Sequence, residues 1–187
     1  VPANFLRVPD IPKMTIEKAL EITNRHASFF LYPFDAVVLH VTIDEGRRDV
    51  FIFSDLGQQR LMLWQCFPPD GSGERTIETV TEFVGCKCEA AESLLISPSG
   101  IETTARNREF NPLQDYIYVA DRGHGRILEL TYTPDKNGGQ LAINREIGKG
   151  VLHWPADVAI SAYGDGNPDN ADLYVVDVGT FNQDGSL

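Results

Sequence analysis

The stretch DYIYVADRGHGRILEL, residues 115–130, decides the fold that this sequence predicts. Two runs of β-branched and aromatic residues, 116–120 and 127–132, flank the segment DRGHG. Such runs favour β-strands, and the glycines between them supply the positive φ that a tight turn needs. The stretch therefore predicts a β-hairpin whose first strand ends at Asp121.

The same frame occurs twice more, in DVFIFSDLGQQRLMLW at 49–64 and in ADLYVVDVG at 171–179. Asp55, Asp121 and Asp177 then hold equivalent positions, 66 and 56 residues apart. The hairpin is therefore one part of a longer unit, and the chain is predicted to be a repeat protein.

The segments before the hairpins repeat in step. Pro33 and Asp35 precede the first hairpin as Pro155 and Asp157 precede the third, at the same separation of 122 residues. Each complete unit then has four strands: one after the proline, the two strands of the hairpin, and a fourth after it. A propeller blade is a sheet of four short antiparallel strands, and such blades repeated around an axis form a β-propeller. We therefore expect an all-β fold, a β-propeller of four-stranded antiparallel blades.

The expected organisation has an N-terminal part and a propeller part. Residues 1–32 are expected to form an arm with a short N-terminal helix, which Thr15 caps and which spans about 16–25. Residues 33–187 are expected to form a partial propeller, with blades at 33–90, 91–150 and 151–187, the last of them incomplete. About two and a half blades do not close a ring. The missing blades are therefore expected from a longer protein or from another chain.

The segment YVADRGHGRI at 118–127 resembles the NHL-repeat family of β-propellers in its order of strand, Asp, glycine turn, Arg and Ile. The segment FIFSDLGQQRLMLW at 51–64 is similar to the related lactonase-type six-bladed propellers. The resemblance covers residues 33–187 and implies a propeller fold. Because such folds host unrelated activities, it does not imply one function.

The metal sites of these families are matched only in part. Metal-dependent NHL lyases place a ligand histidine just after the proline of a blade, where this chain has Ala156. Lactonase-type propellers bind a central Ca²⁺ through carboxylates and asparagines, and Asp35 and Asp157 are the matching carboxylates. His40 and His153 are predicted to be structural residues of a strand and a loop.

Asp165, Asn167 and Asp169 alternate along one loop, as the first ligands of a Ca²⁺ loop do. The twelfth position of that pattern holds Val176 instead of Glu. These three residues form the candidate metal site, for Ca²⁺, and the alternative is a solvated hairpin turn rich in Asp and Asn. No other cofactor is predicted.

The repeated aspartate is followed by an arginine five residues later, in the pairs Asp55–Arg60 and Asp121–Arg126. A catalytic residue has no need to occur once in every unit. The pairs are therefore predicted to be structural, with the carboxylate accepting hydrogen bonds from turn N–H groups and pairing with the arginine.

The composition excludes several classes of partner. Lys and Arg total 16 against 27 Asp and Glu, and a formal charge of −11 argues against nucleic acid and anionic membranes. The sequence has no apolar run long enough to insert into a membrane. The chain opens at Val1 without a leader and is expected to be processed or trimmed, in a secreted or lumenal protein.

The three cysteines leave two alternatives open. Cys66 forms a disulfide with Cys86 or Cys88 if the protein is extracellular, or all of them are half-buried thiols.

The sequence favours a non-catalytic protein-binding or assembly module of a secreted or cell-surface protein. Apolar strand surface near 29–32 and 173–176 is expected to contact another chain or further blades of the same protein. The alternative is part of a Ca²⁺- or Zn²⁺-dependent propeller hydrolase or lyase, whose remaining site residues lie outside this segment. A third interpretation is a calcium-stabilised structural domain.

Overall fold

The computed structural model describes residues 30–68, 76–84, 94–106, 108–161 and 172–179 of the chain. Within these ranges the regular elements are antiparallel β-strands and two single 3-10 turns. The all-β prediction is therefore confirmed. The expected helix at 16–25 lies outside the described residues.

The strands form three sheets, each in sequence order. Sheet 1 contains β1 (Pro33–Ile43), β2 (Gly46–Asp55), β3 (Arg60–Cys66) and β4 (Ile77–Val84). Sheet 2 contains β5 (Pro98–Thr103), β6 (Ile117–Asp121), β7 (Arg126–Thr133) and β8 (Gln140–Ile147). Sheet 3 contains β9 (Pro155–Ile160) and β10 (Leu173–Asp177). Two sheets thus have the predicted four antiparallel strands, and in the described part of sheet 3 the first two are present.

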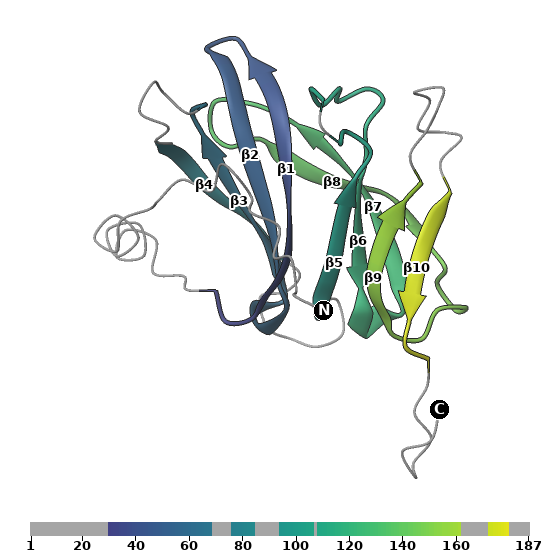
Figure 1. Cartoon of the computed structure of the whole chain (residues 1–187). Coiled ribbons are helices and arrows are strands. Elements are labelled where there is room, and N and C mark those ends of the chain that lie inside the picture. The colour runs from purple at the N-terminus through teal and green to yellow at the C-terminus, as the bar shows by residue number, and fades with distance from the viewer. Residues whose placement is uncertain (1–29, 69–75, 85–93, 107, 162–171, 180–187) are drawn as a thin grey trace, which may run out of the picture.

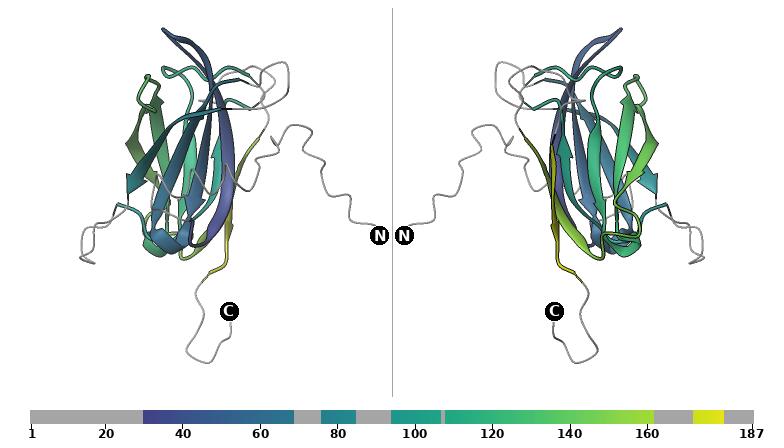
Figure 2. Two further views of the ribbon diagram at one scale, coloured as in Figure 1. Left: turned by 90° about the vertical axis from the view of Figure 1, so that its left-hand side faces the viewer. Right: turned by 90° about the vertical axis from the view of Figure 1, so that its right-hand side faces the viewer.

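The sheets stack face to face in chain order. The first strands of the sheets are neighbours, β1 of β5 and β5 of β9, and Figure 1 shows them in this order from left to right. In the two views of Figure 2 the strands run roughly along one common direction. The described sheets form an open row and do not close into a ring.

Alternation along the strands divides the side chains between two interfaces. The interface between sheets 1 and 2 is built from residues such as Ile52, Leu63, Val119 and Leu128, all buried. The opposite face of sheet 2 packs against sheet 3 and forms a smaller cluster. Sheet 2 contributes Tyr118, Ala120 and Ile127 to it, and sheet 3 contributes Val158 and Ile160. Sheet 2 is therefore covered on both faces.

The hairpins of sheets 1 and 2 turn in the same way. After β2 and β6, 3-10 turns at Leu56–Gln58 and Arg122–His124 each lead into a left-handed residue, Gln59 or Gly125. At Gly125 a side chain would also approach the carbonyl oxygen of Leu152 to 2.6 Å. The glycine is thus required both by its φ of +59° and by the segment that packs over it.

The long loop between β5 and β6 contributes to the core. Phe110 is buried, and its N–H donates a hydrogen bond of 2.7 Å to the carbonyl oxygen of His40 in β1. The ring of Phe110 lies 6.0 Å from that of Tyr132. The loop therefore covers one end of the interface between sheets 1 and 2.

No helix in the described ranges has the length and apolar character needed to cross a membrane.

Candidate functional site

The repeated aspartates hold the sheets together internally. Each ends the second strand of its sheet, as predicted, and its carboxylate accepts hydrogen bonds from backbone N–H groups just before the first strand. Asp55 accepts from Tyr32 at 3.1 Å, Asp121 from Ile96 at 2.8 Å, and Asp177 from Trp154 at 2.7 Å. The carboxylates therefore bind the segments that lead into β1, β5 and β9.

The paired arginines extend this contact across the sheet. Arg126 contacts Asp121 at 2.7 Å and forms a second ion pair with Glu146 in β8. In sheet 1, Arg60 lies 3.4 Å from Asp55 and 2.7 Å from Glu82 in β4, at the equivalent register. Each arginine thus links the second, third and fourth strands. This arrangement confirms the predicted pairing of aspartate with arginine, whereas the N–H donors to Asp55 and Asp121, predicted in the turns, belong to the segments before β1 and β5.

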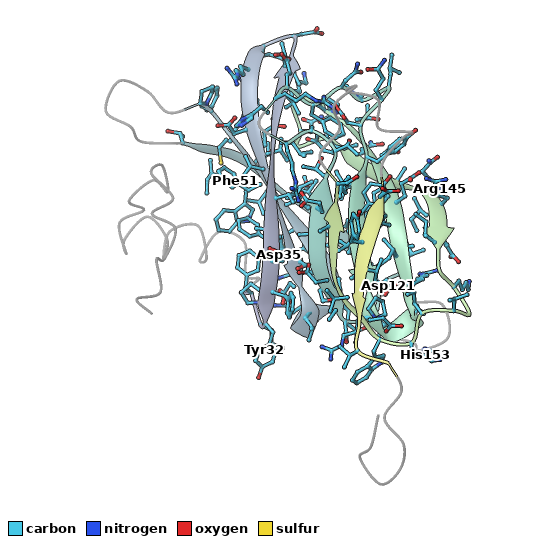
Figure 3. The ribbon with its side chains drawn as sticks, turned by 45° about the vertical axis from the view of Figure 1, so that its right-hand side comes forward. Tyr32, Asp35, Phe51, Asp121, Arg145 and His153 are labelled. Carbon is cyan, nitrogen blue, oxygen red and sulfur yellow. The ribbon has the colours of Figure 1, made fainter. Side chains whose placement is uncertain are left out.

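The described histidines also pair with carboxylates of their own sheets. His40 Nδ1 lies 2.6 Å from Asp49, and His124 Nδ1 lies 2.7 Å from Asp121. His153 lies 3.8 Å from Asp177, and Figure 3 shows it at the same end of the molecule as Asp121. In the described ranges no three His, Cys, Asp or Glu side chains gather as a metal site would require.

The candidate calcium ligands Asp165, Asn167 and Asp169 lie outside the described residues. The calcium site therefore stays a prediction. Calorimetric titration of the chain with Ca²⁺ checks it directly.

Asp35 and Asp157, which match carboxylates of the lactonase-type site, lie on either side of sheet 2. Asp35 Oδ2 accepts a hydrogen bond of 3.1 Å from the N–H of Ile101, which joins β1 to β5 (Figure 3). Asp157 Oδ1 accepts from the N–H of Val158 at 2.8 Å. Gly100 lies against Asp157 so closely that a Cβ there would come within 2.6 Å of the Asp157 Cα. These carboxylates thus sit at tight strand contacts between the sheets.

Other buried polar groups form a closed network that the sequence did not indicate. Glu129 accepts hydrogen bonds from Tyr118 at 2.9 Å and Asn144 at 2.6 Å, and Arg145 lies 2.7 Å from it. Burial, and next the hydrogen bond to Glu129, raises the pKa of the Tyr118 phenol. The phenol therefore stays protonated and acts as a donor at neutral pH.

Cys66 is a buried free thiol, the second of the two alternatives for this residue. Burial raises the pKa of the Cys66 thiol to about 12, so it is not a nucleophile at neutral pH. Its expected disulfide partners, Cys86 and Cys88, lie outside the described residues.

The most unusual surface is the face of sheet 1 that points away from sheet 2, called here the sheet 1 outer face and made of Ala36, Val38, Phe51, Phe53, Met62 and Trp64. Figure 3 shows Phe51 on this side. The ring of Phe53 lies 5.0 Å from that of Trp64, and the ring of Phe30 packs on both at 5.1 and 5.6 Å. Val38, at the edge of the cluster, is 37% exposed.

A second apolar face lies at the other end of the row of sheets. The side of sheet 3 that points away from sheet 2, called here the sheet 3 outer face, carries Ala159, Tyr174 and Val176, with the exposed Asp157 opposite Val176 at its edge. Tyr174 and Val176 are 60% and 59% exposed. They alternate on β10 with Leu173 and Val175, which pack toward sheet 2.

The register shows what these two faces correspond to. The cross-strand pairs Phe53–Met62 and Phe51–Trp64 of sheet 1 match the pairs Val119–Leu128 and Ile117–Leu130 of sheet 2. All four residues of sheet 2 are fully buried, against sheet 1. The sheet 1 outer face therefore has the position and chemistry of a face that receives a preceding sheet.

The sheet 3 outer face corresponds to the opposite half of the same kind of interface. Counting back from the strand-ending aspartates, Tyr174 and Val176 match Tyr118 and Ala120, which are 5% and 0% exposed against sheet 3. Tyr174 and Val176 lie in the region 173–176, where the sequence predicts a contact with another chain or with further blades, and that contact stays a prediction. The sequence could not show that Tyr118 and Tyr174, identical in type and register, differ in exposure.

Comparison with known proteins identifies no relative: no family model, curated protein or solved structure matches the chain.

Proposed function

We propose that the chain is a non-catalytic assembly module whose sheets are successive blades of an NHL-like β-propeller, and that its two outer faces bind β-sheet surface. The observation that carries the proposal is the exposure of Tyr174 and Val176, at positions whose equivalents in sheet 2 are buried between sheets. A face with the register and chemistry of an interface is expected to bind another sheet.

Apolar burial is the driving force in this proposal. We expect an incoming sheet to pack as the sheets of the chain pack on one another, with apolar side chains of both faces in one cluster. Burying a side chain such as Val or Phe contributes about 1.5–3 kcal/mol. A few such residues on each face are enough for a specific association when the partner's surface is complementary.

The non-catalytic part of the proposal is supported by how the polar groups are used. Asp121, Arg126 and Glu129 are buried and engaged in contacts within sheet 2. His40 and His124 pair with carboxylates of their own sheets. These groups therefore stabilise the hairpins and are committed to structural contacts.

Fluorescence of an apolar dye such as ANS, added to the native chain at low protein concentration, tests the proposal. We expect the double variant Tyr174→Glu/Val176→Glu to show a weaker dye signal than the wild type. The combined variant, which also carries Ala36→Glu and Val38→Glu, should lose most of the remaining signal. All four positions are exposed, so the substitutions are compatible with folding.

Leu113→Glu is the matched control, since Leu113 is 90% exposed but lies in the loop between β5 and β6, away from both faces. It should leave the dye signal unchanged. Equal dye signals from the wild type and the combined variant, with unchanged circular dichroism, would contradict the proposal.

A further inference from the structure

We propose that the partner of these faces is a second copy of the chain, joined head to tail: the sheet 3 outer face of one copy packs on the sheet 1 outer face of the next. The inference rests on the proposed function and adds the identity and orientation of the partner. Its basis is that one chain carries both halves of an interface that it already forms twice internally.

The first internal interface defines the two halves. Sheet 1 contributes the side on which Ile52 lies, and sheet 2 contributes the side on which Val119 and Leu128 lie. The second interface repeats this order, with the Tyr118 side of sheet 2 meeting the Val175 side of sheet 3. We call the side of a sheet that faces the next sheet in the chain its rear side, and the side that faces the preceding sheet its front side. In both interfaces the rear side of one sheet packs on the front side of the next.

The two outer faces continue that order without a break. The rear side of sheet 3 presents Tyr174 and Val176. Their equivalents in sheet 1 are Ile52 and Ser54, and these two sheet 1 residues are fully buried. The front side of sheet 1 carries the exposed Ala36 and Val38 and the half-buried Phe53, whose equivalent in sheet 2 is Val119, a residue packed against sheet 1. A third interface of the same type therefore requires only a second copy placed behind sheet 3.

The contact is heterologous, because the two faces are different surfaces of the same molecule. A self-complementary dimer uses the same patch on both copies, whereas a head-to-tail contact leaves one face of each kind free at the two ends of a dimer. Further copies then add until the rotation closes a ring or the chain of molecules extends. This geometry makes the proposal testable with variants that lack one face only.

The test uses sedimentation velocity of the 187-residue chain over the micromolar range. The front variant, Ala36→Glu/Val38→Glu, and the rear variant, Tyr174→Glu/Val176→Glu, each place two carboxylates in one half of the contact. We expect concentration-dependent association of the wild type, and about tenfold or more weaker association of each variant alone. The control Leu113→Glu should associate like the wild type.

Mixing the two variants is the decisive step. The front variant keeps an intact sheet 3 outer face and the rear variant keeps an intact sheet 1 outer face, so an equimolar mixture should regain association and stop at the dimer. Lysine versions of both variants repeat the experiment with the opposite charge, and circular dichroism confirms that every variant is folded.

Other occupants produce different results. If residues before Phe30 cover the sheet 1 outer face, or if an unrelated partner binds the outer faces, the wild type sediments as a monomer while the dye signal of the sheet 3 outer face persists. That result overturns the second-copy inference and leaves the proposed function standing. A mixture that does not regain association, or a loss confined to one variant, also overturns the head-to-tail contact. If the wild type neither associates nor shows a dye signal from its outer faces, the proposed function is rejected as well.

Discussion

At the scale of single residues, one aspartate per sheet organises its surroundings. Asp121 has no exposed surface, and its carboxylate accepts the Ile96 N–H and contacts both His124 and Arg126. A buried carboxylate is stable only when hydrogen bonds and opposite charge compensate for its lost hydration. The repetition of this residue through the chain therefore reflects a structural requirement of each hairpin.

Replacing Asp121 by Asn should destabilise the protein strongly. The substitution keeps the shape of the side chain but leaves the Arg126 guanidinium without its buried counter-charge, which costs about 3–5 kcal/mol of the free energy of unfolding. Urea denaturation measures the loss. Asp177→Asn is the matched control and should cost less, because the Asp177 side chain is 21% exposed and the imidazole of His153 lies 3.8 Å from it.

Asp177 should also make sheet 3 sensitive to acid. Burial acts most strongly on the pKa of Asp177 and raises it, but the N–H groups of His153, Trp154 and Gly179 together hold it below its usual range. A folded-state pKa lower than the unfolded value stabilises the protein at neutral pH. That stabilisation is lost as the pH falls below about 4 and through the folded pKa.

Hydrogen exchange of the segment from 153 to 160, corrected for intrinsic rates, measures this acid effect. We expect protection of His153 and Trp154 to fall in the wild type as the pH is lowered from about 5 to about 2. The change should be absent in Asp177→Asn. Equal protection of these amides at both pH values in the wild type would refute the assigned role of the carboxylate.

At the scale of elements, the inner strands are held at separations that only small residues allow. Gly100 in β5 faces Asp157 in β9, and Asp35 in β1 accepts the N–H of Ile101 from the other side. Asp157 thus contacts a glycine of sheet 2, and Asp35 accepts a hydrogen bond from a backbone N–H of sheet 2. Close approach of β1, β5 and β9 brings the three sheets into one stack.

Gly100→Ala should therefore weaken the contact between sheets 2 and 3. The new methyl group would meet the Asp157 backbone within 2.6 Å, so β9 must shift. Overpacking of this kind costs about 1–3 kcal/mol. Urea denaturation should show the loss, and hydrogen exchange should place it in β9. Thr42→Val, a change at an exposed position of β1, should leave both measurements unaltered. If Thr42→Val lost as much stability as Gly100→Ala, crowding against Asp157 would not be the cause of the loss.

At the scale of the whole molecule, apolar end faces and a high negative charge act against each other. Each copy has a formal charge of −11, so two copies repel at long range. Association through the outer faces must therefore come from apolar burial and must overcome that repulsion. This balance makes salt a sensitive probe of the contact.

Raising the salt concentration should strengthen self-association. Increasing the ionic strength from about 0.01 M to 0.15 M shortens the screening length from about 30 Å to 8 Å and weakens the repulsion between copies. Sedimentation equilibrium at the two salt concentrations measures the change. Association that weakens in salt would point to a contact made by ion pairs and would contradict an apolar interface.

Much of the internal organisation follows from the sequence because it depends on near neighbours. The hairpin in residues 115–130, the turn glycine at Gly125 and the strand end at Asp121 are specified by alternation, positive φ and side chain to backbone hydrogen bonds. Comparison of the copies was then sufficient to place the strands of sheets 1 and 2 and the structural use of the Asp–Arg pairs.

Burial of equivalent residues, by contrast, was decided by tertiary structure. Tyr118 and Tyr174 share residue type, strand position and register, yet one is 5% and the other 60% exposed. The loop residue Phe110 enters the core for the same reason, because it meets His40 of sheet 1, which is distant in sequence. The sequence by itself determined the strands, their pairing and the alternation of side chains between two faces, because these are properties of local backbone geometry. Which of those faces are covered depends on the sheet that packs beside them, and only the tertiary structure could decide it.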